Sequence, residues 1–283
     1  MVGFADVDKR PFLLTSSDAL DAARVIAGSS GRRLDTPVRK SFVRSDAGTA
    51  PPLADLYAGG RSGTVAVKLY LALLWRCASP PYSTDKPARA WATLLDLPDP
   101  DGRGARRVKA AMKSLAARQL VNIAEQPGKP NVVTLLDEGG RARRYALPSS
   151  SYTRAVARGA KRDRLDREVY FKVSTTLWTQ GYMQQLTGAG LVMLLILLAE
   201  QAGQGKEVWI SPAAFAERYN ISHKTRTNGT KDLVQLGLLT TRREPLAAKT
   251  TATVFDPRKI RTVYRLTARA QDTAAASTAG TTP

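Results

Sequence analysis

The chain contains one cysteine and one histidine in 283 residues, and this scarcity excludes several kinds of chemistry. Cys77 has no second thiol with which to form a disulfide or a thiolate metal cage, so we expect a reducing, cytoplasmic setting. His223 lies far from Cys77 in the sequence, and the two lack the spacing of a nucleophile pair or a zinc site. We therefore expect neither cysteine catalysis nor a bound metal.

Acidic residues are also scarce, with 24 Asp and Glu against 43 Lys and Arg. The carboxylates that a two-metal nuclease needs are scattered, and only Asp99 and Asp101 are close together, in a turn where aspartate is common. The stretches "GGRSG" and "GAG" lack the Gly-Lys-Ser/Thr ending of a phosphate-binding loop. The sequence therefore predicts a protein that is not an enzyme and needs no cofactor.

The chain has no hydrophobic run long enough to cross a bilayer. The most apolar run, residues 191–199, is much shorter than the roughly 20 residues that a membrane span needs. The first residues carry acids where a signal peptide has a basic segment, so we expect no secretion signal and no membrane insertion. Positive charge, in contrast, is abundant. A formal net charge of +19 predicts a polyanionic partner: DNA, RNA or an acidic membrane surface.

Two stretches of the chain share one pattern of large apolar residues. The steps of four, two and five residues are the same in both, and the matching residues are Trp91, Leu95, Leu97, Leu115 and Leu120 in the first and Phe215, Tyr219, Ile221, Leu233 and Leu238 in the second. In each, two predicted helices precede a predicted β-hairpin. Both stretches resemble winged helix-turn-helix domains, and the resemblance covers roughly residues 60 to 267.

We therefore expect an α+β fold, mainly α, with two winged helix-turn-helix domains in tandem and a basic linker. The expected boundaries are a partly disordered N-terminal arm over 1–58, a first domain over 59–138, a linker over 139–168, a second domain over 169–267 and a disordered tail over 268–283. In the arm, "SSDALDAARVIAG" predicts one short helix that Ser16 or Ser17 would cap.

In the first domain, helices are expected to begin near Thr64, at Ala88 and near Ala105. On the third helix, apolar side chains gather on one side and cations on the other, the cations being Arg106, Lys109 and Lys113. A solvated helix face is the alternative interpretation of these cations. "LVNIAEQ" and "NVVTLLDE" predict the hairpin, or wing, whose tip carries only Lys129 as a cation.

In the second domain, we expect a strand at "VYFKVS", a buried helix over residues 190–201, a short strand at "EVWIS", and helices capped by Ser211 and Ser222. If Leu233 of the last helix faces the core, Lys224, Asn228, Lys231 and Gln235 face outward. Arg226 then leans toward the core, and we expect it to leave the core near the start of the helix. Gly229 would permit a close approach to a backbone.

Two further segments are rich in cations. The linker is either solvated or in contact with a DNA backbone, and residues 151–167 could form a helix. The connection between "LLTTRRE" and "RTVYRLT" is the expected second wing, which is either a disordered loop or a phosphate contact. The candidate DNA contacts are Arg103, Arg106, Lys109 and Lys113 in the first domain, Arg154, Arg158, Lys161, Arg162 and Arg164 in the linker, and His223, Lys224, Thr227, Asn228, Lys231, Lys249, Arg258, Lys259 and Arg261 in the second domain.

The resemblance implies that the third helix of each domain enters the major groove of double-stranded DNA. The contacts that it implies fall on Arg106, Lys109 and Lys113 in the first domain and on Lys224, Asn228 and Lys231 in the second. Similar tandem domains occur in transcriptional regulators, in plasmid replication initiators and in partner subunits of chromosome-condensing complexes. We expect a nucleoid-associated regulator that binds as a homodimer or as a cooperative assembly on repeated sites. A replication initiator and a non-catalytic scaffold remain alternatives.

Overall fold

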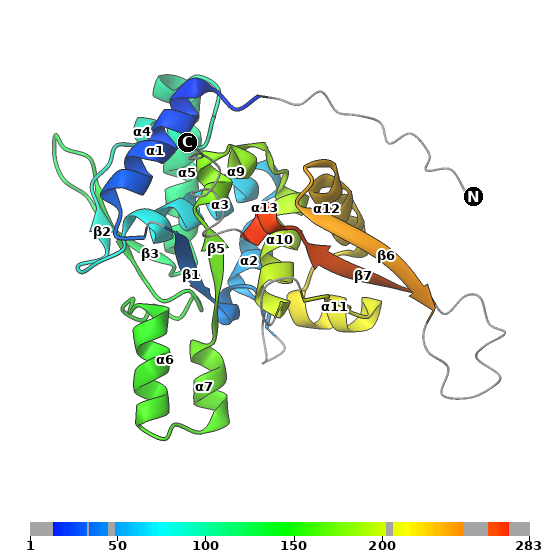
Figure 1. Cartoon of the computed structure of the whole chain (residues 1–283). Helices are drawn as coiled ribbons and strands as arrows, with labels where there is room; N and C mark the ends of the chain where they lie inside the picture. The colour runs from blue at the N-terminus through cyan, green and yellow to red at the C-terminus, as the bar shows by residue number, and fades with distance from the viewer. Residues whose placement is uncertain (1–13, 33, 45–48, 202–205, 246–259, 272–283) are drawn as a thin grey trace, which may run out of the picture.

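The computed structural model describes residues 14–32, 34–44, 49–201, 206–245 and 260–271 (Figure 1). The protein is α+β and mainly helical, and the residues that the structure describes form three small antiparallel sheets. The helices are α1 Ser17–Ser29, α2 Pro52–Tyr57, α3 Gly60–Arg76, α4 Ala88–Leu94, α5 Ala105–Ala117, α6 Pro148–Ala157, α7 Arg162–Glu168, α8 Thr176–Thr179, α9 Tyr182–Gln185, α10 Gly188–Glu200, α11 Pro212–Tyr219, α12 His223–Gln235 and α13 Ala268–Gln271, with short turns η1 Lys40–Phe42 and η2 Pro100–Gly104. The strands are β1 Asp35–Arg39, β2 Ser83–Thr84, β3 Val121–Ala124, β4 Val132–Leu135, β5 Tyr170–Ser174, β6 Leu239–Pro245 and β7 Ile260–Leu266. No helix among the described residues is both long and apolar enough to span a bilayer.

The N-terminal segment is part of the folded body. Ser16 caps α1, because its hydroxyl accepts a hydrogen bond from the backbone N–H of Ala19. After α1, the side chains of Val38, Phe42 and Leu56 are buried in the main core. The capped helix is confirmed, and the described part of the segment that was expected to be an arm supplies buried apolar side chains to the core. Residues 1–13 and 272–283 lie outside the described residues, and with them most of the expected tail.

Residues 60–135, which we call the first unit, run through a helix, a short strand, two helices and a hairpin. These are α3, β2, α4, α5 and β3–β4. The strands lie in the order β2-β4-β3, with Val121 opposite Leu135 and Ser83 opposite Thr134. α5 packs on α3 and α4, so the hairpin closes one side of a small three-helix cluster.

Residues 188–266, the second unit, repeat the same order of elements. They comprise α10, a single bridge from Val208 to Tyr264, α11, α12 and the hairpin β6–β7. Ser211 caps α11 and Ser222 caps α12 as expected, since each hydroxyl accepts a hydrogen bond from a backbone N–H three residues later. α10 is apolar on all sides because it packs against α12, α3 and β5.

The two units share one hydrophobic core. α10 packs on α3, and buried side chains of both units belong to one cluster. Trp178 of α8, between the units in the sequence, stacks on Trp75 of α3 with ring centroids 5.9 Å apart. The strand expected to open the second domain, β5, pairs instead with β1, with Val38 opposite Phe171. Two segments more than 130 residues apart in the sequence thus pair in one sheet, and both units pack on the same core.

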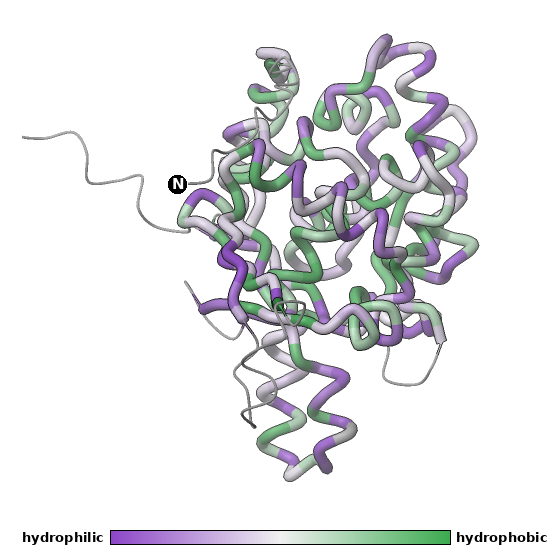
Figure 2. The backbone as a smooth tube through the Cα atoms, turned by 90° about the vertical axis from the view of Figure 1, so that its right-hand side faces the viewer, coloured by the Kyte–Doolittle hydropathy of each residue, from purple (hydrophilic) through white to green (hydrophobic). Residues whose placement is uncertain are grey.

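The segment expected to be a basic linker forms a helical hairpin, which we define as residues 148–168. α6 and α7 lie side by side and project away from the rest of the molecule (Figure 1). The view turned by 90° shows the same projection below the body (Figure 2). The segment is helical as expected, but two helices stand where one over residues 151–167 was predicted, with a break between Ala157 and Arg162.

Candidate nucleic-acid interface

The exposed face of α12 carries polar and cationic side chains at helical spacing. Lys224, Thr227, Asn228 and Lys231 are all exposed, and within the described residues no ion pair joins either lysine to an acid. An asparagine amide offers a donor and an acceptor together, and an ammonium offers donors only. This combination matches the hydrogen-bonding edges of bases and the phosphates beside them. Gln235, also expected outward, is half-buried.

The opposite face of α12 is buried and fixes how the helix is rotated. Arg226 is only 7% exposed. Its Nε donates to the hydroxyl of Tyr264 at 3.0 Å, and its Nη2 donates to the carbonyl of Ile210 at 2.8 Å. The guanidinium also lies over the ring of Phe215, 4.8 Å from its centroid. The expectation that Arg226 leaves the core is wrong, because partners on three other elements hold its charge inside.

Gly229 and Asp232 bring α12 close to α10. A Cβ at Gly229 would lie 2.3 Å from the carbonyl oxygen of Ala189, so the two helix backbones are in contact here. Asp232 accepts hydrogen bonds from the N–H and the hydroxyl of Thr187, the residue that caps α10. The backbone approach expected at Gly229 exists, and the neighbouring backbone is that of α10.

His223 occupies the first position of α12 and is exposed. The cap by Ser222 leaves other backbone N–H groups of the first turn free of intrahelical partners. Such a helix start attracts anions, and an exposed imidazole beside it adds a donor or an acceptor. The start of α12 therefore suits a phosphate oxygen better than a catalytic role.

The charged side chains on the exposed face of α5 are all cations. Arg106, Lys109 and Lys113 are exposed, while the buried side consists of Val108, Ala111, Met112 and Leu115. No ion pair joins these three cations to an acid in the described part of the chain. The apolar and basic sides predicted from the sequence are confirmed, although α5 lacks the amide groups that α12 offers.

Arg103 lies just before α5, in the turn η2. The Asp99 carboxylate accepts hydrogen bonds from the backbone N–H groups of Arg103 and Gly102, at 2.8 and 3.1 Å. The hydrogen bond from Arg103 is the main cause that holds the pKa of Asp99 below its ordinary value. The Arg103 side chain lies 3.7 Å from this carboxylate. Its charge is thus partly offset, which makes it a weaker phosphate contact than the cations of α5.

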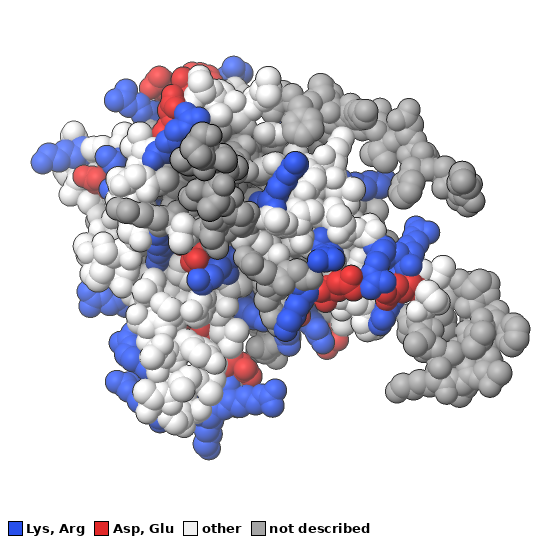
Figure 3. All heavy atoms as spheres, in the orientation of Figure 1, with Lys and Arg blue, Asp and Glu red and all other residues white. Residues whose placement is uncertain are grey.

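The two β-hairpins differ in charge. The first bears Lys129 as its one cation near the tip, as expected, with Glu125 in the same connection. Near the outer end of the second, Arg261 pairs with Glu244 at 3.0 Å and lies over the ring of Trp209, while Arg242 pairs with Glu207 at 2.6 Å. Arg243 and Arg265 on the same strands are exposed, and no ion pair joins them to an acid within the described residues, so this hairpin keeps an excess of positive charge. Figure 3 shows blue and red atoms mixed beside it. Lys249, Arg258 and Lys259 lie outside the described residues.

The cations of the helical hairpin lie on a projecting surface. The five expected contacts there are all exposed: Arg154, Arg158, Lys161, Arg162 and Arg164. Only Arg162 has an acid nearby among the described residues, Asp166 at 4.0 Å. Figure 3 shows these cations gathered around the lower projection. They form a mainly positive patch that projects from the body, with the exposed Asp166 among them.

A buried arginine that the sequence analysis missed holds the helical hairpin in place. The Arg39 guanidinium bonds to the carboxylates of Glu138 and Glu168, to the carbonyl of Ala146 and to the hydroxyl of Ser151. Burial raises the pKa of Glu138 to about 7, although the Arg39 charge opposes this. Burial alone would lower the pKa of Arg39, but the surrounding carboxylates raise it overall. The partners of Arg39 come from segments about 100 to 130 residues away, so no local signal could reveal them.

Lys68 on α3 is a buried lysine whose pKa depends on charges on both α5 and α12. Lys68 on α3 donates from Nζ to the carbonyl of Gln184 at 2.8 Å. Burial lowers its pKa to about 8, Asp232 of α12 opposes that shift, and Arg107 of α5 adds to it. Charged side chains on α5 and α12 therefore both shift the pKa of this lysine. Arg107 is itself exposed and was missed as a candidate contact, although its neighbour Arg106 could have signalled it.

The chain was compared with protein-family models, with curated proteins and with solved structures, and nothing matches. In the described ranges, no three His, Cys, Asp or Glu side chains gather into a group that could hold a metal ion. Three exposed surfaces are therefore the candidates for a function: the polar face of α12, the cationic face of α5 and the helical hairpin.

Proposed function

We propose that this protein is a sequence-specific double-stranded DNA-binding protein with two winged helix-turn-helix units in tandem. The observation that carries the proposal is the division of α12 into two faces. One face is fixed against α10 by Gly229, Asp232 and Leu233, and the other presents Lys224, Asn228 and Lys231 to solvent. A helix held rigidly with such a face outward is suited to the major groove.

The two units contribute differently in this proposal. α12 supplies base discrimination through its amide and ammonium groups, because these can match particular base edges. α5 and the helical hairpin supply affinity, because guanidinium and ammonium groups neutralise phosphates whatever the sequence. Since the units share one core, α5 and α12 keep a fixed spacing. The binding site should then have two parts at a set separation.

The first experiment selects preferred duplexes from a random pool with the full chain, and then tests Asn228→Ala with Lys231→Ala. We expect the double variant to lose about 1–3 kcal/mol of binding to the selected duplex for each base contact removed, and little on random duplex. The matched control is Arg24→Ala with Ser29→Ala on α1, which also removes one cation and one polar group from an exposed helix face. Equal losses on selected and random duplexes would remove α12 from the role of base reader.

The biological role that we propose is transcriptional regulation, with binding as a homodimer or cooperatively on repeated sites. The fixed spacing of α5 and α12 also suits the repeated sites of a replication origin, so an initiator is the second candidate. Mapping the genomic sites that the protein occupies separates the two roles. Promoter sites support regulation, a repeat array at an origin supports initiation, and occupancy without discrete sites would support a scaffold.

A further inference from the structure

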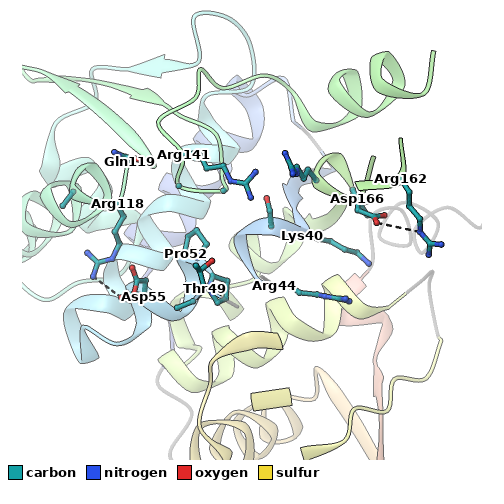
Figure 4. A pocket seen from close by; sticks show the side chains of 18 residues that line it. Lys40, Arg44, Thr49, Pro52, Asp55, Arg118, Gln119, Arg141, Arg162 and Asp166 are labelled. Atoms are coloured by element: carbon teal, nitrogen blue, oxygen red, sulfur yellow. Dashed lines mark hydrogen bonds and ion pairs between the residues drawn. The ribbon is translucent and has the colours of Figure 1, made fainter. Parts of the chain in front are cut away.

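A basic groove opens where four segments of the chain meet. Its volume is about 1020 Å³, and its walls come from η1 and the residues after it, from α2, from the end of α5 with the turn at residues 139–141, and from α7. Six cations line it: Lys40, Arg44, Arg118, Arg141, Arg162 and Arg167. Only Asp55 and Asp166 oppose them on the lining. The labelled cations lie on both sides of the groove, with Arg118 and Arg141 across from Arg162 (Figure 4).

Backbone contacts build the walls of this groove. Arg118 donates from its guanidinium to the carbonyls of Asp55 and Ser114, which ties the end of α5 to α2. Gly140 has a φ of +66°, and a Cβ there would lie 3.2 Å from the carbonyl oxygen of Arg118. Glycine thus allows the turn that carries Arg141 to lie close over Arg118. On the other wall, Arg44 pairs with Glu200 of α10 at 3.6 Å.

We propose that this groove binds the sugar–phosphate backbone of duplex DNA beside the segment that α5 contacts, an inference that rests on the proposed function. Converging cations from separate segments favour an anion with several charges. The described residues that line the groove include no Phe, Tyr, Trp or His, so they offer no ring on which a base could stack. Small residues such as Gly139 and Ala117 let phosphates approach the surface instead. A duplex backbone therefore fits better than a single strand or a free nucleotide.

The exposed face of α5 leads into the groove. Arg106, Lys109 and Lys113 are followed on the same helical face by Ala117, which lines the groove. Arg106 and Ala117 are separated by roughly 16 Å along the helix axis, at about 1.5 Å per residue. This equals the length of about five base pairs at about 3.4 Å each. A duplex that follows α5 would then bring its backbone to the groove without a break in positive charge.

The test uses the full chain with Lys40→Gln, Arg141→Gln and Arg167→Gln, three groove cations whose side chains have no hydrogen bond or ion pair within the described residues. The control carries Arg24→Gln, Lys172→Gln and Arg269→Gln, which remove the same charge outside the groove. Binding to a random-sequence duplex is measured by fluorescence anisotropy over a salt series. We expect the plot of log affinity against log salt to flatten by about 2.7, at about 0.9 per phosphate contact, for the groove variant only.

A slope equal to that of the control would overturn the groove assignment. A single strand of the same length is titrated in parallel, and a larger loss there than on duplex would overturn the choice of duplex. If the triple variant does not fold, as judged by its circular dichroism, Arg141→Gln alone should flatten the slope by about 0.9. If the groove variant flattens the salt slope but the unaltered chain shows no sequence preference, only the proposed sequence specificity is refuted. If the groove variant has the slope of the control and the unaltered chain is sequence-specific, only the groove assignment is refuted. If the unaltered chain binds no duplex at all, both proposals are refuted.

Discussion

The contact between α12 and α10 makes a sharp prediction about Gly229. An alanine there would place its Cβ 2.3 Å from the carbonyl oxygen of Ala189 and 2.8 Å from the Cβ of Met193. An ordinary carbon–oxygen contact is about 3.3 Å or longer, so α12 would have to withdraw by roughly 1 Å. Overpacking of this kind costs about 1–3 kcal/mol. The gain in helix propensity on replacing glycine by alanine is only about 1 kcal/mol.

Gly28 provides the matched control, because it also lies in a helix but has open space around it. No atom lies within 4 Å of a Cβ built at Gly28 on α1. Gly28→Ala should therefore stabilise the protein by about 0.4–1 kcal/mol through helix propensity and chain entropy. Gly229→Ala should destabilise it by up to about 2 kcal/mol, because the neighbours are backbone and Cβ atoms that cannot rotate away and the overpacking cost exceeds the gain in helix propensity. The same substitution thus has opposite signs at the two sites.

Urea unfolding of the two variants and the unaltered chain measures both free energies. Binding to the selected duplex is measured beside it, because a shift of α12 by roughly 1 Å would also misplace Asn228. We expect Gly229→Ala to weaken specific binding more than random binding, and Gly28→Ala to change neither. If both variants were stabilised alike, the close contact with α10 and the argument for a rigidly held α12 would be refuted.

Two further predictions concern buried charges. Lys68 has a folded pKa of about 8, below its unfolded value of roughly 10.4, so between these pH values the unfolded chain keeps a proton that the folded chain has lost. As pH rises from about 7 to above roughly 10.5, the unfolding free energy of the unaltered chain should therefore increase by up to about 3 kcal/mol relative to that of Lys68→Met. A difference that stays constant with pH would contradict the burial of the ammonium. Arg39→Met should leave Glu138 without its cation and cost about 3 kcal/mol or more. Amide hydrogen exchange should then quicken in α6 and α7 but not in α3, and unchanged protection of both helices would show that Arg39 does not hold the helical hairpin.

Local patterns in the sequence predict the serine caps, the two hairpins and the longer helices α1, α3, α4, α5, α10, α11 and α12. They miss the short helices α2, α8 and α9, and α13 lies at the start of the tail that was expected to be disordered. Each predicted feature depends on residues close together in the chain: the hydroxyl of Ser211 or Ser222 reaches a backbone N–H three residues later, and apolar side chains recur at helical spacing. The outward faces of α5 and α12 follow from the same periodicity. These parts of the candidate interface are therefore predictable from the amino-acid sequence alone.

Features that depend on distant partners could not be predicted. β1 is only five residues long, contains Pro37, and pairs with a strand more than 130 residues later, so its pattern resembles that of a loop. The helical wheel pointed Arg226 inward, but only the structure shows Tyr264 and Phe215 around it. The basic groove has no signal at all, because its cations come from four separate segments.

Because the cationic surfaces are held rigidly, variants of the helical hairpin and of α12 should change affinity for DNA and sequence specificity separately. Arg39 fixes the helical hairpin to β1, and β1 pairs with β5, which packs on α10 of the second unit. α10 in turn fixes α12 through Asp232. In the proposed function, a phosphate contact by the helical hairpin and a base contact by α12 would therefore belong to one rigid body. Their free energies should add, because neither contact has to order the other, unless the DNA itself bends between them. Non-additive losses in combined hairpin and α12 variants would then report deformation of the DNA.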